Sequence, residues 1–199
     1  MKNILTLTKK GILIVAMLAT VLGFAEGDAK VIVKRDAKKT TITLEDVKPG
    51  DLVSIKDNQG IIIFKESVET TGTYKKGFDL TELANGDYVF EIDKDLEVNT
   101  IPFKVRANEI EFDESEESTY FKPHTKKEAD LLYVTKLCSN NEATIINIFN
   151  EVEQGTYKMV HSELIENTLA IKKVYKLNKG NYKITIHSNN KEYTKFINN

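Results

Sequence analysis

The chain has 199 residues, with 28 lysines and arginines against 30 aspartates and glutamates, one cysteine, three histidines and no tryptophan. This near balance leaves no basic excess to neutralise phosphates, so the composition argues against nucleic-acid binding. The hydrophobic content of 41% excludes a disordered chain, and a single cysteine excludes an internal disulfide framework.

Residues 1–25 have the layout of a cleavable secretory signal, which we expect to be helical. Three lysines (Lys2, Lys9 and Lys10) precede an uncharged, mostly apolar run over 11–24, and Ala25 and Glu26 flank the predicted cleavage site. The alternative is a membrane anchor, but the run is shorter than the roughly 20 residues that a spanning helix needs. The sequence therefore predicts export.

The predicted mature chain, 26–199, has 174 residues, which is 199 less the 25 of the signal. Three lysines and no acids leave with the signal, so 25 basic and 30 acidic residues remain and the net charge is −5. No later apolar run is long enough to span a bilayer. We expect a periplasmic, outer-membrane-associated or extracellular protein.

Short apolar runs separated by turn residues recur along the mature chain, and no long stretch keeps a 3.6-residue period. Tyr88, Phe90 and Ile92 alternate with polar or smaller residues, as in a strand with one buried face. The 57–60 segment (DNQG) has the composition of a hairpin turn. The predicted strands cover 31–34, 41–44, 52–56, 61–64, 73–80, 87–92, 100–105, 110–112, 131–138, 144–149, 156–160, 169–177, 181–187 and 192–197. This spacing predicts an all-β sandwich rather than a βαβ fold.

Acidic residues crowd the middle of the chain, where 108–118 reads NEIEFDESEES. We interpret 113–127 as a solvated acidic linker between a first module, 26–112, and a second, 128–199. A cation site is the alternative, but the spacing lacks the glycine that an EF-hand loop needs.

An internal repeat is the most informative feature of the sequence. The pattern L-x-x-G-x-Y occurs twice at an offset of 94 residues, as Leu83, Gly86 and Tyr88 and as Leu177, Gly180 and Tyr182. Upstream, 53–57 aligns with 146–150 at an offset of 93, which also aligns Phe64 with Tyr157. The repeat predicts two tandem modules, each about the size of an immunoglobulin-like antiparallel sandwich.

The repeated pattern has a structural explanation. We expect the leucine to anchor a loop on the core, the glycine to adopt a positive φ, and the tyrosine to begin a strand with its hydroxyl on a backbone partner. This arrangement is analogous to the tyrosine corner of sandwich domains. These six residues are therefore predicted to serve folding.

The first copy carries further motifs, VSIKDNQG over 53–60 and FDLTELANGDY over 78–88. They resemble the C-terminal sorting domain of the type IX secretion system of Bacteroidetes. The second copy keeps Leu177, Gly180 and Tyr182 but has no D-x-x-G turn. The whole chain is similar to small secreted proteins of that phylum with a signal peptide and two such modules. The resemblance implies recognition by an outer-membrane translocon.

Catalytic and metal-binding patterns are absent from the sequence. The histidines at 124, 161 and 187 show no metal-ligand spacing, and we interpret them as surface residues. Cys138 ends an apolar strand and is predicted to be a buried thiol, with an intermolecular disulfide as the alternative. Four aspartates that could serve hydrolysis or calcium binding fit turns instead: Asp57, Asp79, Asp93 and Asp95.

We therefore expect a non-enzymatic, exported tandem β-sandwich protein without catalytic residues, metal or cofactor. Its partner would be an envelope protein or a polysaccharide. The eight tyrosines and nine phenylalanines could offer rings for sugars or peptides, but the absence of tryptophan argues against this, and alternation places most of these rings inward. The first alternative is a sorting module associated with the secretion translocon, and the second is a secreted hydrolase.

Overall fold

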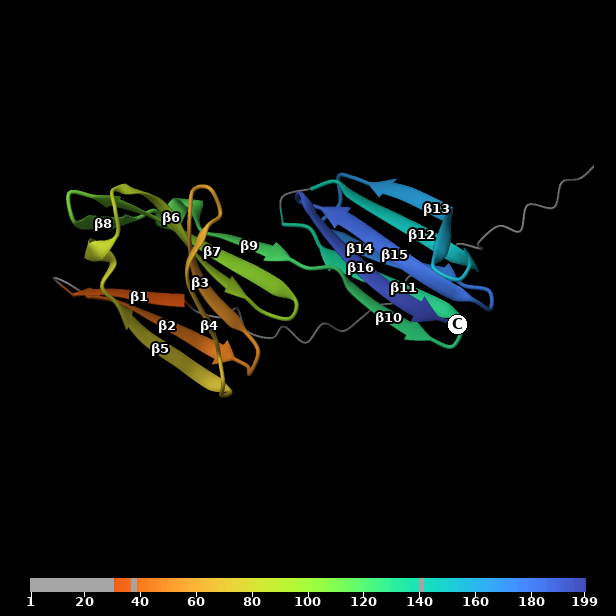
Figure 1. Ribbon diagram of the computed structural model, residues 1–199, viewed down its shortest axis with the longest axis horizontal. Coiled ribbons are helices and arrows are strands. Elements are labelled where there is room, and N and C mark those ends of the chain that lie inside the picture. Colours follow the sequence, from red (N-terminus) through yellow and green to blue (C-terminus); the bar gives the residue numbers. More distant parts are fainter. Residues whose placement is uncertain (1–30, 37–38, 140–141) are drawn as a thin grey trace, which may run out of the picture. The chain divides into compact units, whose positions relative to one another are not determined.

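The computed structural model describes residues 31–36, 39–139 and 142–199 (Figure 1). The chain forms two compact units that meet between Lys122 and Pro123, called here the N-terminal and the C-terminal unit. The predicted signal, 1–25, and its cleavage site at Ala25 and Glu26 lie outside the described residues. Within the described part of the chain, no helix has the length and apolarity needed to cross a bilayer.

The N-terminal unit is built from two antiparallel sheets. The smaller has the order β1 (Val31–Asp36), β2 (Lys39–Val47), β5 (Gly72–Phe78). The larger has the order β4 (Ile62–Ser67), β3 (Leu52–Asp57), β6 (Gly86–Asp93), β7 (Glu97–Arg106), β8 (Glu109–Phe112), with β9 (Ser118–Phe121) also paired to β7. Two single-turn helices, η1 (Leu80–Glu82) and η2 (Glu114–Glu116), connect strands.

The C-terminal unit repeats this arrangement. Its smaller sheet has the order β10 (His124–Glu128), β11 (Leu131–Leu137), β14 (Ala170–Lys176). The larger has the order β13 (Thr156–Ile165), β12 (Thr144–Glu153), β15 (Asn181–Ser188), β16 (Lys191–Asn198). Strands β10 to β16 therefore match β1 to β7 in order and in sheet membership, and β8 and β9 belong to the N-terminal unit alone.

The strand registers fix which residues are equivalent. Val53 lies opposite Ile92 on β6, and Ile146 lies opposite Ile186 on β15. At the other end of these strands Tyr88 lies opposite Asp57, and Tyr182 opposite Asn150. The L-x-x-G-x-Y repeat thus marks the same strand in both units.

Each unit encloses one apolar core drawn from both of its sheets, which confirms an all-β, sandwich-like fold. In the N-terminal unit Ile42 of β2 and Phe90 of β6 are fully buried. In the C-terminal unit Leu132 of β11 and Ile148 of β12 are fully buried. Alternation of apolar residues along the strands places one face of each sheet on this core.

The predicted linker over 113–127 differs from the structure, which places η2, β9 and β10 there. Tyr120 of β9 is buried and lies opposite Val98 on β7, so this short strand is held by the N-terminal unit. Strand β10 is an edge strand with mostly exposed side chains, and its polar sequence resembled a linker for that reason.

Two details of the predicted repeat need correction. Phe64 is equivalent to His161, since these residues lie opposite Ile55 and Ile148, whereas Tyr157 lies opposite Glu151. The reason is that β12 and β13 extend further towards their hairpin than β3 and β4 do. In both units a register shift follows the corresponding residue pair, so even the β-bulge is repeated.

The second correction concerns the repeated glycines. Gly180 has a φ of +144°, as predicted, but Gly86 is not among the glycines with positive φ. A Cβ atom on Gly86 would lie 3.5 Å from the ring of Tyr88, which is ordinary van der Waals contact. Gly86 therefore belongs to an extended strand and leaves space beside the tyrosine ring.

Candidate binding face of the C-terminal sheet

The outer face of the β13-β12-β15-β16 sheet is the strongest candidate for a functional surface. Ile146 and Ile148 of β12 and Ile184 and Ile186 of β15 point into the core. Because side chains alternate along a strand, the residues between them lie on the opposite face. The cross-strand register arranges these outer residues in three rows.

The middle row is polar and runs across all four strands as Ser162, Asn147, Thr185 and Thr194. The Ser162 hydroxyl donates to Asn147 Oδ1 at 2.7 Å, and Asn147 Nδ2 donates to Thr185 Oγ1 at 3.3 Å. These bonds hold the amide of Asn147 in one orientation. The row therefore presents fixed polar groups rather than mobile ones.

The next row and one neighbouring ring form what we call the aromatic patch. Its members are Phe149, Tyr157, Met159, Lys183 and Phe196, and each of the four strands contributes at least one. The ammonium group of Lys183 lies 4.7 Å from the centre of the Phe149 ring and 5.7 Å from that of Tyr157. The Tyr157 and Phe196 rings lie 6.0 Å apart. Phe196 is 62% exposed and Met159 is 50% exposed, so much of the patch faces solvent.

The third row is Leu164, Ile145, His187 and Glu192, and the last three of these line a shallow concavity of about 490 Å³. Ile145 and His187 line it together with the loop at 142–143 and the hairpin turn at Asn189 and Asn190. His187 Nε2 lies 3.5 Å from Glu192 Oε2. The outer face thus has aromatic rings at one end and a shallow hollow at the other, where exposed Leu164 and Ile145 stand beside polar residues.

The N-terminal unit has the same sheet but different outer residues. Lys56 stands where Phe149 does and forms an ion pair with Glu91 at 2.6 Å. Val89 and Pro102 stand at the positions of Lys183 and Phe196. The same fold therefore forms without aromatic rings at these three positions, and among the described residues the aromatic patch is found only in the C-terminal unit.

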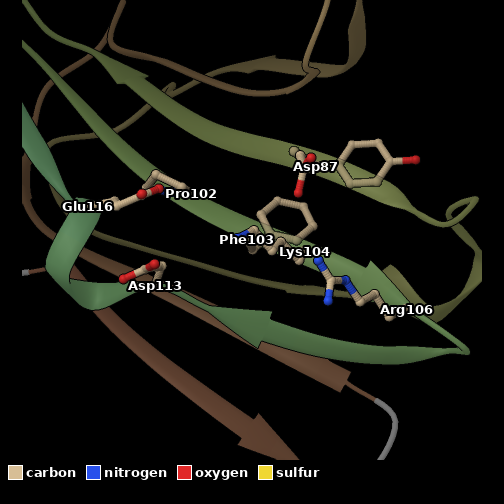
Figure 2. A pocket seen from close by; sticks show the side chains of 8 residues that line it. Asp87, Pro102, Phe103, Lys104, Arg106, Asp113 and Glu116 are labelled. Atoms are coloured by element: carbon tan, nitrogen blue, oxygen red, sulfur yellow. The ribbon is translucent and has the colours of Figure 1, made fainter.

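A second concavity, of about 330 Å³, lies on the N-terminal unit (Figure 2). Lys104 and Arg106 lie close together in it, with Asp87 on one side and Asp113 towards the other end. Lys104 lies opposite Asp87 across the sheet, so the two opposite charges are neighbours. The hydrogen bonds from Ser115 to Asp113 lower the pKa of this exposed carboxyl, with a smaller contribution from Lys104. The positive and negative side chains that line this concavity therefore largely neutralise one another.

Both units also carry a glutamate between their two sheets, at Glu66 and Glu163. Glu66 accepts hydrogen bonds from Lys76 and from the Tyr74 hydroxyl, the latter at 3.1 Å. Glu163 accepts from Lys173 and, at 2.9 Å, from the Tyr175 hydroxyl. In the sandwich these contacts join β4 to β5 and β13 to β14. The repetition of the cluster indicates a structural role, and sequence reasoning missed it because its residues are far apart in the chain.

The leucines and tyrosines of the L-x-x-G-x-Y repeat contact the cores, whereas Gly86 is exposed and Gly180 is partly buried. Leu83 packs on the N-terminal core, and Leu177 and Tyr182 are buried in the C-terminal core. The Tyr88 hydroxyl donates to the carbonyl of Ala84 at 2.8 Å, four residues earlier. None of these residues reaches the outer face described above.

The other sequence candidates lie apart from one another. Asp57 accepts from the amides of Gln59 and Ile61 in its hairpin turn, and Asp79 caps η1. Asp93 pairs with Lys122. His161 contacts the ring of Tyr175, with the ring centres 5.2 Å apart, and Cys138 is buried. In the described part of the chain, no three of these residue types gather in a metal-binding arrangement.

No known protein family and no curated protein matches the sequence. The resemblance to type IX sorting domains stays a prediction that depends on its motifs.

Proposed function

We propose that the protein is an exported, non-enzymatic binding protein of the cell envelope, made of two immunoglobulin-like modules. The exposed aromatic patch of the C-terminal unit carries this proposal. Signal-like residues 1–25 support export, and the matched seven-strand topology together with the Tyr88 corner supports the immunoglobulin-like assignment.

The comparison between the two units explains why the aromatic patch points to binding. Large apolar side chains are rarely gathered on the solvated face of a sheet unless something covers them. The N-terminal unit has exposed Ile62 at the position of Met159, but it shows that the fold does not need the aromatic rings, since Lys56 and Pro102 stand at the positions of Phe149 and Phe196. Phenylalanine, tyrosine and methionine, which make up most of the patch, are enriched at the centres of protein binding surfaces.

Binding through the aromatic patch can be tested by site-specific photo-cross-linking in the full chain. A photoreactive phenylalanine analogue at position 196 is expected to capture an envelope component, and the same analogue at the equivalent position 102 is the matched control. Phe149→Ala should reduce retention of the protein on envelope fractions without unfolding it. Equal capture at both positions, together with unchanged retention of the Phe149→Ala variant, would contradict the proposal.

A further inference from the structure

Strand β16 forms one edge of the larger C-terminal sheet, and its backbone groups alternate regularly between bonding β15 and pointing away from it. Asn199 and Gly180 exchange both of their backbone hydrogen bonds, at 2.9 and 2.8 Å. In an antiparallel pair, residues that bond their partner alternate with residues that do not. Counting back from Asn199, the residues whose N–H and C=O groups point away from β15 are Glu192, Thr194, Phe196 and Asn198.

Strand β16 is also regular, since it pairs with β15 over eight successive residues without a register shift. At the opposite edge the pairing of β13 with β12 has two register shifts, one of which places an extra residue, Val160, on β13, and a bulge of this kind hinders the addition of further strands. Among the described residues, β15 is the only strand paired with β16. The flat edge of this sheet is therefore the one at β16.

The N-terminal unit shows what this edge can hold. There the equivalent strand, β7, pairs on its far side with β8 and β9. Pro102, at the position of Phe196, has no N–H to offer, and its carbonyl accepts a hydrogen bond from the amide of Asp113 at 3.3 Å. This bond confirms that the equivalent backbone groups point outward.

The strand at that position alternates acidic and apolar residues. Glu109 and Glu111 of β8 lie opposite Arg106 and Lys104 of β7, while Phe112 is buried. Opposite charges directly across a strand pair stabilise it. The chain thus covers the β7 edge with a segment of complementary charge.

The edge at β16 carries a charge of its own on the core side. Lys195 lies opposite Ile184, which is fully buried, and stands where the N-terminal unit has the buried Ile101. Lys195 itself is exposed, so its ammonium group reaches solvent at the strand edge, where a lysine hinders uncontrolled strand pairing. The core side of β16 has no acidic residue, so a second copy of the chain offers Lys195 no complementary charge there, whereas an acidic strand does.

We propose that the β16 edge binds an extended, acidic segment of a partner protein, which adds to the sheet as an antiparallel strand. Its carboxylates lie opposite Lys195, and its apolar residues lie beside Phe196 on the outer face. The inference rests on the proposed binding function and adds the class of partner and the mode of binding, which is strand addition.

The test uses the full chain and a synthetic peptide that copies residues 107–121 (ANEIEFDESEESTYF), the acidic and apolar segment that contains β8 and β9. Amide hydrogen exchange of Thr194, Phe196 and Asn198 should slow when the peptide binds, because their N–H groups gain acceptors. The amides of Tyr193, Lys195 and Ile197 should already be protected in the free protein. A peptide with lysine in place of its glutamates should bind at least about tenfold more weakly.

Thr194→Pro is the decisive variant, since it removes an outward N–H without removing a bond to β15. It should weaken peptide binding about tenfold, whereas Thr194→Ala keeps the N–H and should bind as the unaltered chain does. Retained protection of the Tyr193 and Lys195 amides shows that each variant is folded.

The outcomes separate this inference from the proposed function. In one outcome, Phe149→Ala abolishes retention on envelope fractions, Thr194→Pro leaves retention unchanged, and the peptide protects no amides. This result would overturn strand addition and leave the proposed binding function standing. If the protein shows neither retention on envelope fractions nor peptide-induced amide protection, both the proposed function and strand addition are overturned. Protection that rises with protein concentration without peptide, together with a dimer in sedimentation, would assign the edge to a second copy and overturn the acidic partner.

Discussion

The hydroxyl of Tyr175 donates a hydrogen bond to Glu163 at 2.9 Å, and this bond joins the two sheets of the C-terminal unit. Glu163 lies opposite Ile146, the position that Glu66 takes opposite Val53 in the N-terminal unit. The lysine that pairs with each glutamate is also equivalent, since Lys76 and Lys173 lie opposite Ile42 and Val134. The tyrosine differs, because Tyr74 precedes its lysine by two residues while Tyr175 follows by two. The charge pair is therefore the repeated element, and the hydroxyl reaches it from either side.

We expect the C-terminal cluster to make stability depend on acid pH. Although burial alone raises the pKa of Glu163, the hydrogen bonds from Lys173 and Tyr175 outweigh it and lower the pKa. A lowered pKa stabilises the fold above about pH 4.3, the value of an unfolded glutamate, and this stabilisation is lost as pH falls towards the native pKa. Glu163→Gln should cost about 1–2 kcal/mol at neutral pH.

Urea denaturation at pH 7 and pH 3.5 measures this difference. The unfolding free energy of Glu163→Gln should change less with pH than that of the unaltered chain. Glu66→Gln is the matched variant, and its effect should be smaller because Glu66 is 39% exposed against 22% for Glu163. Parallel pH dependences for the unaltered chain and Glu163→Gln would show that Glu163 does not contribute.

The strand pattern could be predicted from the sequence because alternation and turn residues are local signals. The hairpin at Asp57 is an example, since Asp57 accepts the amides of Gln59 and Ile61 as the DNQG composition suggests. Strand β10 could not be predicted, because an exposed edge strand such as His124–Glu128 has no apolar side to alternate. Without an apolar signal, only its pairing with β11 identifies it as a strand.

The candidate binding face lay beyond sequence reasoning for a different reason. Phe149, Lys183 and Phe196 are each separated by more than ten residues and meet only through the register of three strands. Alternation with Tyr182 and Ile184 already predicts that Lys183 faces water. Phe149 and Phe196 are apolar and suggest a place in the core, and only the observed register shows that they lie beside Lys183 on the outer face.

The two repeated glycines should respond differently to alanine. Gly180 has a φ of +144°, and a Cβ atom there would lie 3.0 Å from Asn150 Nδ2, so Gly180→Ala is expected to destabilise the protein by about 1–3 kcal/mol. Gly86→Ala meets only ordinary contacts and should cost less than about 1 kcal/mol. Thermal unfolding of both variants measures the difference. Equal losses would show that the repeated glycine has one role in both units, contrary to the structure.

The thiol of Cys138 should be slow to react in the native protein. It is 1% exposed, and burial raises its pKa, an effect that the nearby Lys136 only partly offsets. Because the thiolate is the reactive form, alkylation by iodoacetamide at pH 8 should be about a hundredfold slower than in denaturant. Mass spectrometry of timed samples follows the reaction. A native rate equal to the denatured rate would place the thiol at the surface.

Lys136 offers the sharpest test of the core of the C-terminal unit. It lies opposite Ile171 on β14, the position of the buried Leu44 in the N-terminal unit, and its side chain is fully buried. The ammonium group donates to Glu142 and, at 3.0 Å, to the carbonyl of Leu137. Removing one partner of a buried ion pair leaves an uncompensated charge and costs about 3–5 kcal/mol.

Glu142→Gln should therefore lower the free energy of unfolding by about 3 kcal/mol, while Lys136→Leu, which copies Leu44, should cost less, because the Glu142 carboxylate that it leaves without Lys136 is 15% exposed and within reach of water. Adding Lys136→Leu to Glu142→Gln should restore most of the loss, because no buried charge then lacks a partner. Urea denaturation of the three variants measures these energies. If Lys136→Leu alone costs as much as Glu142→Gln, the ion pair itself stabilises this end of the sandwich, and the comparison with Leu44 is wrong.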